Sequence, residues 1–183
     1  MMPRIQTLAR DATTEPTRKI LDGVEKALGM VPNLHLTLAH APAALAGYAL
    51  LADALGRGRL DPRLRERIAV ATAARNGCGY CASAHHLLGK NAGLSPEELD
   101  RNLVGESGDA RAAAALELVS SLVENRGRVD EALVLRARDA GFDDGELLEI
   151  VAHVGMNTLT NLLNNFAGTE IDFPEVPLPE EAR

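Results

Sequence analysis

The two cysteines of the chain, Cys78 and Cys81, are separated by two residues in the stretch NGCGYCASAHH, and His85 follows four positions after the second. Side chains three and four positions apart share one face of a helix, so a helix beginning near Cys78 would place all three on one stripe. His86 would point about 100° away from that stripe. Unpaired N–H groups in the first helical turn favour a thiolate. The spacing therefore predicts a reactive thiol with a histidine one turn away.

Lowering the pKa of the thiol is not enough to explain the value of a nearby histidine. An ordinary thiol is about 3% ionised at pH 7, and lowering its pKa by about two units raises that fraction roughly 25-fold. The same shift lowers the nucleophilicity of the thiolate roughly eightfold, for a Brønsted coefficient of about 0.45. The net gain in reaction rate at pH 7 is therefore only about threefold. An efficient reaction would therefore also need orientation and proton delivery, and His85 is placed to deliver a proton.

Glu66 is the nearest carboxylate candidate, twelve residues before Cys78 on the preceding helical segment. In one straight helix this offset would rotate Glu66 about 120° from Cys78, but a break at Gly77 allows the two segments to fold against each other. Glu66 could instead be a surface carboxylate paired with Arg63 or Arg67. Spacing alone leaves both interpretations open.

Redox chemistry explains the cysteine pair better than the three alternatives, which are a metal site, a structural disulfide and inert burial. A structural zinc site usually closes with four ligands, and only Glu66 and His86 are additional candidates nearby. A thioredoxin-like site would follow a strand, and no strand pattern precedes Cys78. Two inert buried thiols stay an open alternative, whereas a structural disulfide is not expected in a reducing compartment.

Composition and periodicity predict an all-α fold. Apolar residues make up 46% of the 183 residues, with only two Tyr, three Phe and no Trp, so the core must be built mainly from Ala, Leu and Val. We expect a single helical domain over residues 1–183, a multi-helix bundle of about eight helices. The expected helical segments are residues 16–29, 31–40, 43–56, 61–75, 78–93, 95–99, 109–125, 129–141 and 143–166.

Capping patterns mark two of these segments, and the chain ends in a different kind of segment. Ser95 is a candidate cap with Glu98 completing a capping box, and Asp143 is expected to cap toward Glu146. Residues 169–183 are proline-rich and acidic, which predicts an extended C-terminal tail lying on the surface or on a neighbouring subunit.

Charge and hydropathy exclude several function classes. The formal net charge is −7 and no run of basic residues occurs, so we expect no nucleic-acid partner. The first residues lack the apolar core of a secretory signal. The most apolar segment, residues 34–56, is interrupted by His35, His40, Pro42 and Asp53, which predicts buried helix and no membrane span. We therefore expect a cytoplasmic protein.

Glu66, Cys78, Cys81 and His85 together form the pattern E-x11-C-x-x-C-x-x-x-H. This pattern, followed by GKNAGLSPEEL, resembles the signature of the alkylhydroperoxidase D branch of the carboxymuconolactone decarboxylase family, in its longer, peroxidase-related type. The resemblance covers a core motif region at about residues 60–105. It implies a helical subunit that assembles into a homo-oligomer, a trimer or hexamer, and reduces a hydroperoxide substrate without a metal or other cofactor.

The resemblance also implies a role for each residue of the pattern. Cys81 would attack the peroxide and become a sulfenic acid, which Cys78 would resolve as a disulfide. His85 and Glu66 would relay protons. A dithiol reductant, such as a lipoyl-bearing or thioredoxin-like protein, would complete the cycle. Tyr80 stands where some members of the branch have a histidine.

Two other functions stay open from the sequence: a lactone decarboxylase-like enzyme, and a non-enzymatic redox-sensing or interaction protein. Tyr80 is expected to fill a pocket wall or hydrogen-bond the site. His86 is expected at the surface or a subunit contact, and His153 as a core or interface histidine with its hydrogen bonds satisfied. No chemistry is assigned to the asparagines that gather near the end of the last helix, Asn157, Asn161, Asn164 and Asn165.

Overall fold

The structure, a computed structural model, describes residues 2–180. Over this range it contains nine α-helices, a 3-10 turn at Arg10–Ala12 and no strand, which confirms the all-α prediction. Each of the nine expected segments overlaps one of these helices, so the expected number of about eight is one too low. The helices are α1 Glu15–Leu28, α2 Asn33–Leu38, α3 Pro42–Gly56, α4 Pro62–Arg75, α5 Gly79–Asn91, α6 Pro96–Leu103, α7 Ala110–Glu124, α8 Glu131–Asp139 and α9 Asp144–Ala167.

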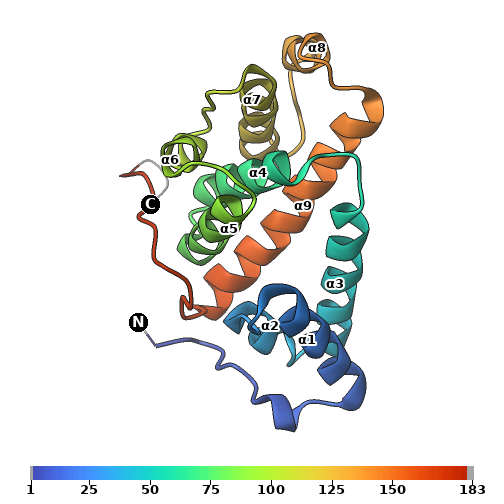
Figure 1. Ribbon diagram of the computed structural model, residues 1–183, viewed down its shortest axis with the longest axis vertical. Coiled ribbons are helices and arrows are strands. Elements are labelled where there is room, and N and C mark those ends of the chain that lie inside the picture. The colour runs from blue at the N-terminus through green and yellow to red at the C-terminus, as the bar shows by residue number, and fades with distance from the viewer. Residues whose placement is uncertain (1, 181–183) are drawn as a thin grey trace.

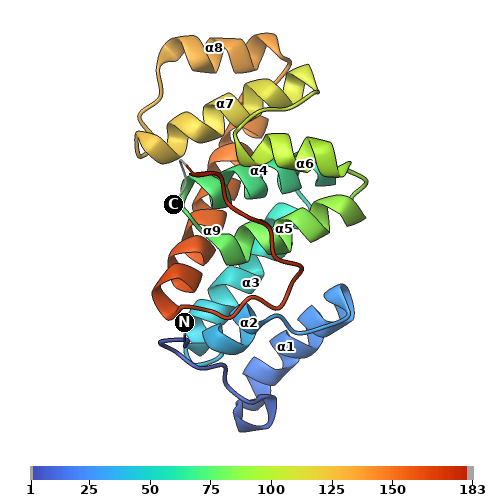
Figure 2. The same ribbon diagram turned by 90° about the vertical axis from the view of Figure 1, so that its left-hand side faces the viewer.

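Helix α4 is the centre of the bundle, because it packs against α5, α6, α7 and α9. The long helix α9 runs obliquely through the molecule, with α7 and α8 at one end and α1 and α2 at the other (Figures 1 and 2). Two apolar cores meet at α4. The first core contains both cysteines with Leu21, Leu45 and Val70, and the second is formed mainly by side chains of α4, α7 and α9.

Capping side chains explain several helix ends. The Asp61 carboxylate accepts hydrogen bonds at the start of α4, and the predicted capping box between Asp143 and Glu146 begins α9. Ser95 caps α6 as expected, but the capping box with Glu98 is wrong. The Glu98 carboxylate turns instead toward Arg67 and the loop between α6 and α7, where it finds stronger donors.

The junction of α4 and α5 positions the cysteines. The predicted break is present: Gly77 has a φ of 62°, a left-handed conformation that glycine adopts without strain. The N–H of Gly77 bonds to the carbonyl of Ala74 and that of Cys78 to the carbonyl of Ala73, which closes α4. The chain then reverses, so that α5 packs along α4.

The tail after α9 lies along its own chain. Residues 169–179 have no regular secondary structure, and they pass across α5 (Figure 2). The Val176 N–H donates to the Ser83 hydroxyl at 3.0 Å, and the Phe173 ring meets the Tyr80 ring edge-on at 5.6 Å between centroids. The extended conformation was predicted, and these contacts show what holds it. Residues 181–183 of the predicted tail lie outside the described residues.

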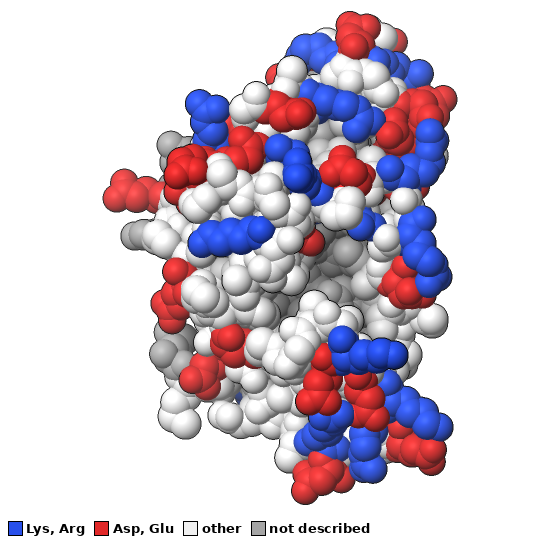
Figure 3. All heavy atoms as spheres, in the orientation of Figure 1, with Lys and Arg blue, Asp and Glu red and all other residues white. Residues whose placement is uncertain are grey.

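Charged side chains are unevenly distributed over the face seen in Figure 1. They gather at its two ends, over α7 and α8 and over α1, while its middle is mainly uncharged and hollowed (Figure 3). None of the helices in residues 2–180 has both the length and the apolar character that crossing a membrane requires.

Candidate active site

The two cysteines lie at the start of α5. Cys78 is the N-cap residue, and its sulfur accepts a hydrogen bond from the Cys81 N–H at 3.3 Å. Cys78 is fully buried and Cys81 is 3% exposed. Cys81 and His85 lie one turn apart on α5, as the spacing predicts, whereas Cys78 stands just before the helix. Both cysteines are free thiols.

The Cys81 sulfur is the one that favours a negative charge. The pKa of Cys81 is lowered to about 6, mainly because the Cys78 thiol donates to it. Burial opposes this change, while positive charge on His85 and the amides of Asn164 and Asn161 support it. Of the two cysteines, Cys81 is therefore the one that ionises first.

The pKa of Cys78 shifts in the opposite direction. Donation of its S–H to Cys81, together with burial and the nearby charge, raises the pKa of Cys78 well above the ordinary thiol value. The N–H groups at the helix start favour a charge on Cys78, as expected, but they are outweighed there. Cys81 is favoured instead by the Cys78 thiol and by the side chains around it. Two adjacent buried thiols cannot both carry a negative charge, so one of them keeps the proton.

Glu66 reaches the site from α4. Its Oε2 lies 2.8 Å from Nδ1 of His85, and the two side chains are 21% and 22% exposed. The alternative partners are occupied elsewhere, because Arg63 donates to the Ala92 carbonyl and Arg67 pairs with Glu98. The interpretation of Glu66 as an arginine-paired surface residue is therefore wrong.

The Glu66 carboxylate controls the charge of His85. Burial by itself lowers the pKa of the His85 ring, but the negative charge and hydrogen bond of Glu66 outweigh it, with a further contribution from Cys81. The pKa of His85 is consequently raised above its ordinary value. The Glu66 carboxylate thus favours a protonated imidazole beside the Cys81 thiolate, which is the state that proton delivery requires.

Asn164 was missed as a site residue. Its Nδ2 lies 3.2 Å from the Cys81 sulfur, and its side chain is buried. Asn157, Asn161 and Asn164 follow one another at helical spacing, and all three are buried within α9. A polar stripe at this spacing, on a helix that is otherwise apolar inward, could have indicated a buried polar partner but not which one.

Two tyrosines flank the cysteines in different ways. Tyr80 points away from the thiols: its hydroxyl accepts the Leu34 N–H at 3.1 Å, and burial raises its pKa. Tyr80 was expected to fill a pocket wall or to hydrogen-bond the site. Its hydroxyl instead makes a structural hydrogen bond to α2. Tyr48 of α3, which the sequence did not indicate, is close enough to the site that its pKa, raised to about 12 mainly by burial, also responds to Cys81 and Glu66.

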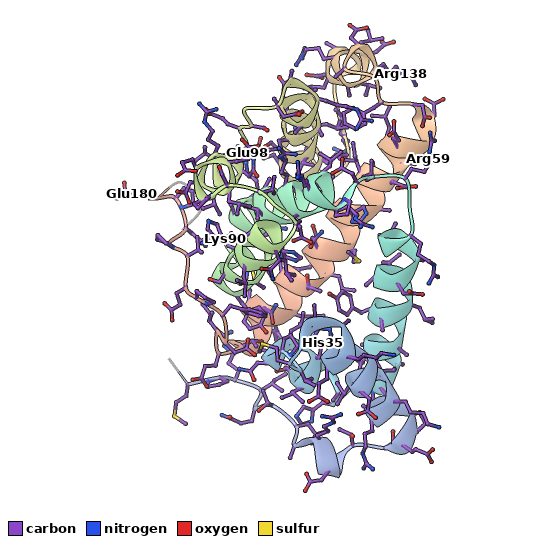
Figure 4. All side chains as sticks on the ribbon, viewed as in Figure 1. His35, Arg59, Lys90, Glu98, Arg138 and Glu180 are labelled. Atoms are coloured by element: carbon purple, nitrogen blue, oxygen red, sulfur yellow. The ribbon has the colours of Figure 1, made fainter. Side chains whose placement is uncertain are left out.

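Three further histidines are buried near these elements. His86 is only 7% exposed, so its expected surface position is wrong; it faces Asp100 at 3.4 Å, beside a pocket of about 260 Å³ that the tail helps to line. His153 is buried as expected, but its Nε2 has no hydrogen-bond partner among residues 2–180, so it is not satisfied. His35 lies on α2 (Figure 4), where burial lowers its pKa to about 4.

No group of three or more His, Cys, Asp or Glu side chains within the described part of the chain is arranged to hold a metal ion. His86 faces Asp100, and Glu66 is bonded to His85. The two residues that could complete a zinc site with the cysteines thus have other partners.

Comparisons with known proteins agree with this fold. A model of the carboxymuconolactone decarboxylase family matches residues 39–121. A peroxidase-related protein from Ralstonia eutropha, described as an alkylhydroperoxidase AhpD core, has a TM-score of 0.86 and 29% identity, over 94% of this chain and 93% of that chain. Among curated proteins, none matches the chain.

Two further solved structures share the fold at lower identity. A peroxidase-related protein from a Silicibacter species has a TM-score of 0.80 at 23% identity, covering 93% of this chain and 94% of that one. The debrominase Bmp8, in a complex with 2,3,4-tribromopyrrole, has a TM-score of 0.81 at 18% identity, covering 94% and 93%. At these identities the likeness shows the fold.

The fold and these relatives define a class, that of all-helical proteins from a family that includes enzymes. The chain is similar to the carboxymuconolactone decarboxylase family over residues 39–121, and to an alkylhydroperoxidase D-like protein over nearly its whole length.

Proposed function

We propose that this protein is a thiol-dependent hydroperoxide reductase. The observation that carries the proposal is the Cys81 sulfur, whose pKa is about 6, standing beside a protonated thiol and one helical turn from His85. Peroxidase-related relatives with the same fold support it. A thiolate, a proton donor and a second thiol are the three groups that the reaction needs.

In the first step, the Cys81 thiolate attacks the outer oxygen of the hydroperoxide. An S–O bond forms and the O–O bond breaks, which leaves a sulfenic acid on Cys81 and an alkoxide. The alkoxide takes a proton from His85 and departs as the alcohol. Because Nδ1 of His85 is bonded to Glu66, the other ring nitrogen is free to donate, either directly or through a water.

In the second step, the Cys78 sulfur attacks the sulfenic sulfur. The disulfide forms, and the Cys78 proton leaves with the sulfenic hydroxyl as water. The high pKa of Cys78 keeps it protonated while Cys81 reacts with peroxide, so the two thiols act in order. Two thiols of an external dithiol then reduce the disulfide and are oxidised in turn.

The test is hydroperoxide consumption by the purified protein with cumene hydroperoxide and excess dithiothreitol. Cys81→Ser should lose at least about 10³-fold in rate, because it removes the nucleophile. Cys78→Ser should form one equivalent of sulfenic acid, detected by dimedone labelling and mass spectrometry, without forming the internal disulfide. Full activity of Cys81→Ser would show that the nucleophile is wrongly assigned.

The reductant and the assembly are part of the same proposal. A dithiol should regenerate the enzyme much faster than a monothiol such as glutathione, because its second thiol closes an intramolecular disulfide. A lipoyl-bearing or thioredoxin-like protein would fit that chemistry. Analytical ultracentrifugation should show a trimer or hexamer, and a monomer would remove the homo-oligomer from the proposal.

The two alternative functions predict different results. A lactone decarboxylase would turn over carboxymuconolactone even when both cysteines are replaced by serine. A redox sensor would change its oligomeric state on oxidation while consuming little more than one equivalent of peroxide.

A further inference from the structure

The cysteine pair raises the question of which sulfur carries the charge. A thiol and a thiolate in hydrogen-bond contact share one proton, and its position depends on the surroundings of each sulfur. Backbone groups favour charge on Cys78, because its sulfur accepts the Cys81 N–H and is also stabilised by the backbone of Tyr80. Cys81 therefore needs partners that outweigh them.

His85 contributes positive charge from α5, and helix α9 supplies further partners. Asn164 donates from Nδ2 to the Cys81 sulfur at 3.2 Å. Asn161, fully buried one turn earlier on α9, lies close enough to help lower the pKa of Cys81. Side-chain amides do not titrate, so these donors persist whatever the protonation state of His85.

Asn76 fixes the orientation of this pair. Its Nδ2 donates to Oδ1 of Asn161 at 2.8 Å, which leaves the NH₂ group of Asn161 directed away from Asn76. The Asn76 carbonyl also accepts from Nδ2 of Asn165 at 3.0 Å. The loop that leads into Cys78 is therefore tied to the same helix that carries the two amides.

Hydrogen bonds within the fold account for only one polar atom of each of the two amides. Oδ1 of Asn164 and Nδ2 of Asn161 are buried and have no hydrogen-bond partner of ordinary geometry among residues 2–180. Leaving buried polar atoms unpaired is costly, and leucine at such positions would pack without that cost. The presence of asparagine at both positions is explained if the amides serve the charged sulfur.

We propose that Asn164 and Asn161, oriented by Asn76, place the negative charge of the cysteine pair on Cys81. Asn164 contacts the sulfur directly, and Asn76 is a positioning residue that acts through Asn161. This inference rests on the proposed function only in one respect, the identity of the substrate that the thiolate attacks. The location of the charge can be measured without any peroxide.

The experiment uses Cys78→Ser protein, in which Cys81 is the sole cysteine. The rate of alkylation by iodoacetamide as a function of pH gives the pKa of Cys81. Asn164→Asp is nearly isosteric and replaces the donor with a carboxylate, so the pKa should rise by about one unit or more. Asn164→Gln, which retains an amide, should restore part of the shift.

Asn157→Asp is the matched control. Asn157 is 3% exposed, as Asn164 is, and lies on the same face of α9, but its Nδ2 donates to the His153 carbonyl. Its substitution should move the pKa of Cys81 by less than half as much, because the new charge is not in contact with the sulfur. An equal shift from both variants would overturn the proposal, since the effect would then not be specific to Asn164.

A second measurement uses protein with both cysteines present. At pH 6.5, mass spectrometry should find alkylation mainly on Cys81, and Asn164→Asp should move it toward Cys78. Asn76→Ala, a change in the partly exposed loop, should act in the same direction more weakly, and it serves if Asn164→Asp does not fold. An unchanged Cys81 pKa in the folded variants would overturn the inference. Shifted pKa values in a protein that consumes no hydroperoxide would instead overturn the proposed function.

Discussion

Two largely buried carboxylates, Glu66 on α4 and Glu98 on α6, have similar exposure but very different surroundings. Glu66 is 21% exposed and has one hydrogen-bond partner, Nδ1 of His85. Glu98, labelled in Figure 4, is 15% exposed. Its carboxylate accepts hydrogen bonds from Arg67, Asn102, Ser107 and the Gly108 N–H. Burial raises the pKa of Glu98, but these donors outweigh it and lower the pKa to about 2.

The difference shows what separates a structural carboxylate from a reactive one. Glu98 is saturated with donors and holds α6 and the following loop to α4, so it stays charged and exchanges no proton. Glu66 has one titratable partner, and its charge therefore changes the protonation of another group. The number and kind of donors decide the role here, since burial is nearly the same.

The largest expected effect is on the reactive carboxylate. Glu66→Gln keeps the shape but removes the charge that raises the pKa of His85, so kcat/KM for hydroperoxide should fall by about 10²-fold or more. Steady-state kinetics at pH 7 would measure it, with the melting temperature as a check on folding. Glu98→Gln is the matched control and should retain its kcat/KM below its melting temperature. Similar losses of kcat/KM in both variants would contradict the different roles assigned to Glu66 and Glu98.

The structural carboxylate should dominate stability. Glu98→Gln weakens the ion pair with Arg67, so it should lower the free energy of unfolding by about 2 kcal/mol. For a chain of this size the melting temperature should drop by roughly 4–8 °C. Calorimetry at pH 7 would test this. Glu66→Gln should cost less than half as much, because its carboxylate has a single partner.

The pH dependence should separate the two carboxylates again. The Cys81 thiolate is lost as pH falls below about 6, and protonated His85 is lost as pH rises through its raised pKa, so kcat/KM should be bell-shaped. The lowered pKa of Glu98 stabilises the fold above its unfolded value near 4.3, and this contribution disappears as pH falls toward 2. At pH 5 the protein should therefore be folded but about tenfold less active. Simultaneous loss of structure and activity, followed by circular dichroism, would contradict this.

The smallest effect on activity is expected for Tyr80, which lies next to Cys81 in sequence but outside the group formed by Cys81, His85 and Glu66. Tyr80 is adjacent to Cys81 in sequence, but its hydroxyl bonds to the Leu34 N–H. Tyr80→Phe should lower stability by about 1 kcal/mol, because it leaves a buried N–H without its acceptor, and kcat/KM should stay within about twofold. A tenfold loss of activity at unchanged stability would make Tyr80 part of that group.

Errors made from the sequence share a physical cause. Glu98 was expected to complete a local capping box, but donors from α4 and from the loop after α6 were stronger than the local backbone group. His86 was expected at the surface, because nothing in its neighbourhood along the chain shows that the tail lies across α5. In both cases the missing information was a contact between residues far apart in sequence.

The sequence by itself determined the features that follow from local spacing. The α-helical fold, the break at Gly77, and the placement of Cys81 one turn before His85 depend on backbone preferences and on a repeat of 3.6 residues per turn. These act within a few residues and are readable without tertiary contacts.

Only the tertiary structure decided which groups surround the sulfurs. Glu66 reaches His85 through the packing of α4 on α5, and Asn164 reaches Cys81 from 83 residues further along the chain. Whether such side chains meet depends on how neighbouring helices are rotated about their axes and at what angle they cross, which many weak contacts determine together. The same contacts decide that Cys81, and not Cys78, carries the charge.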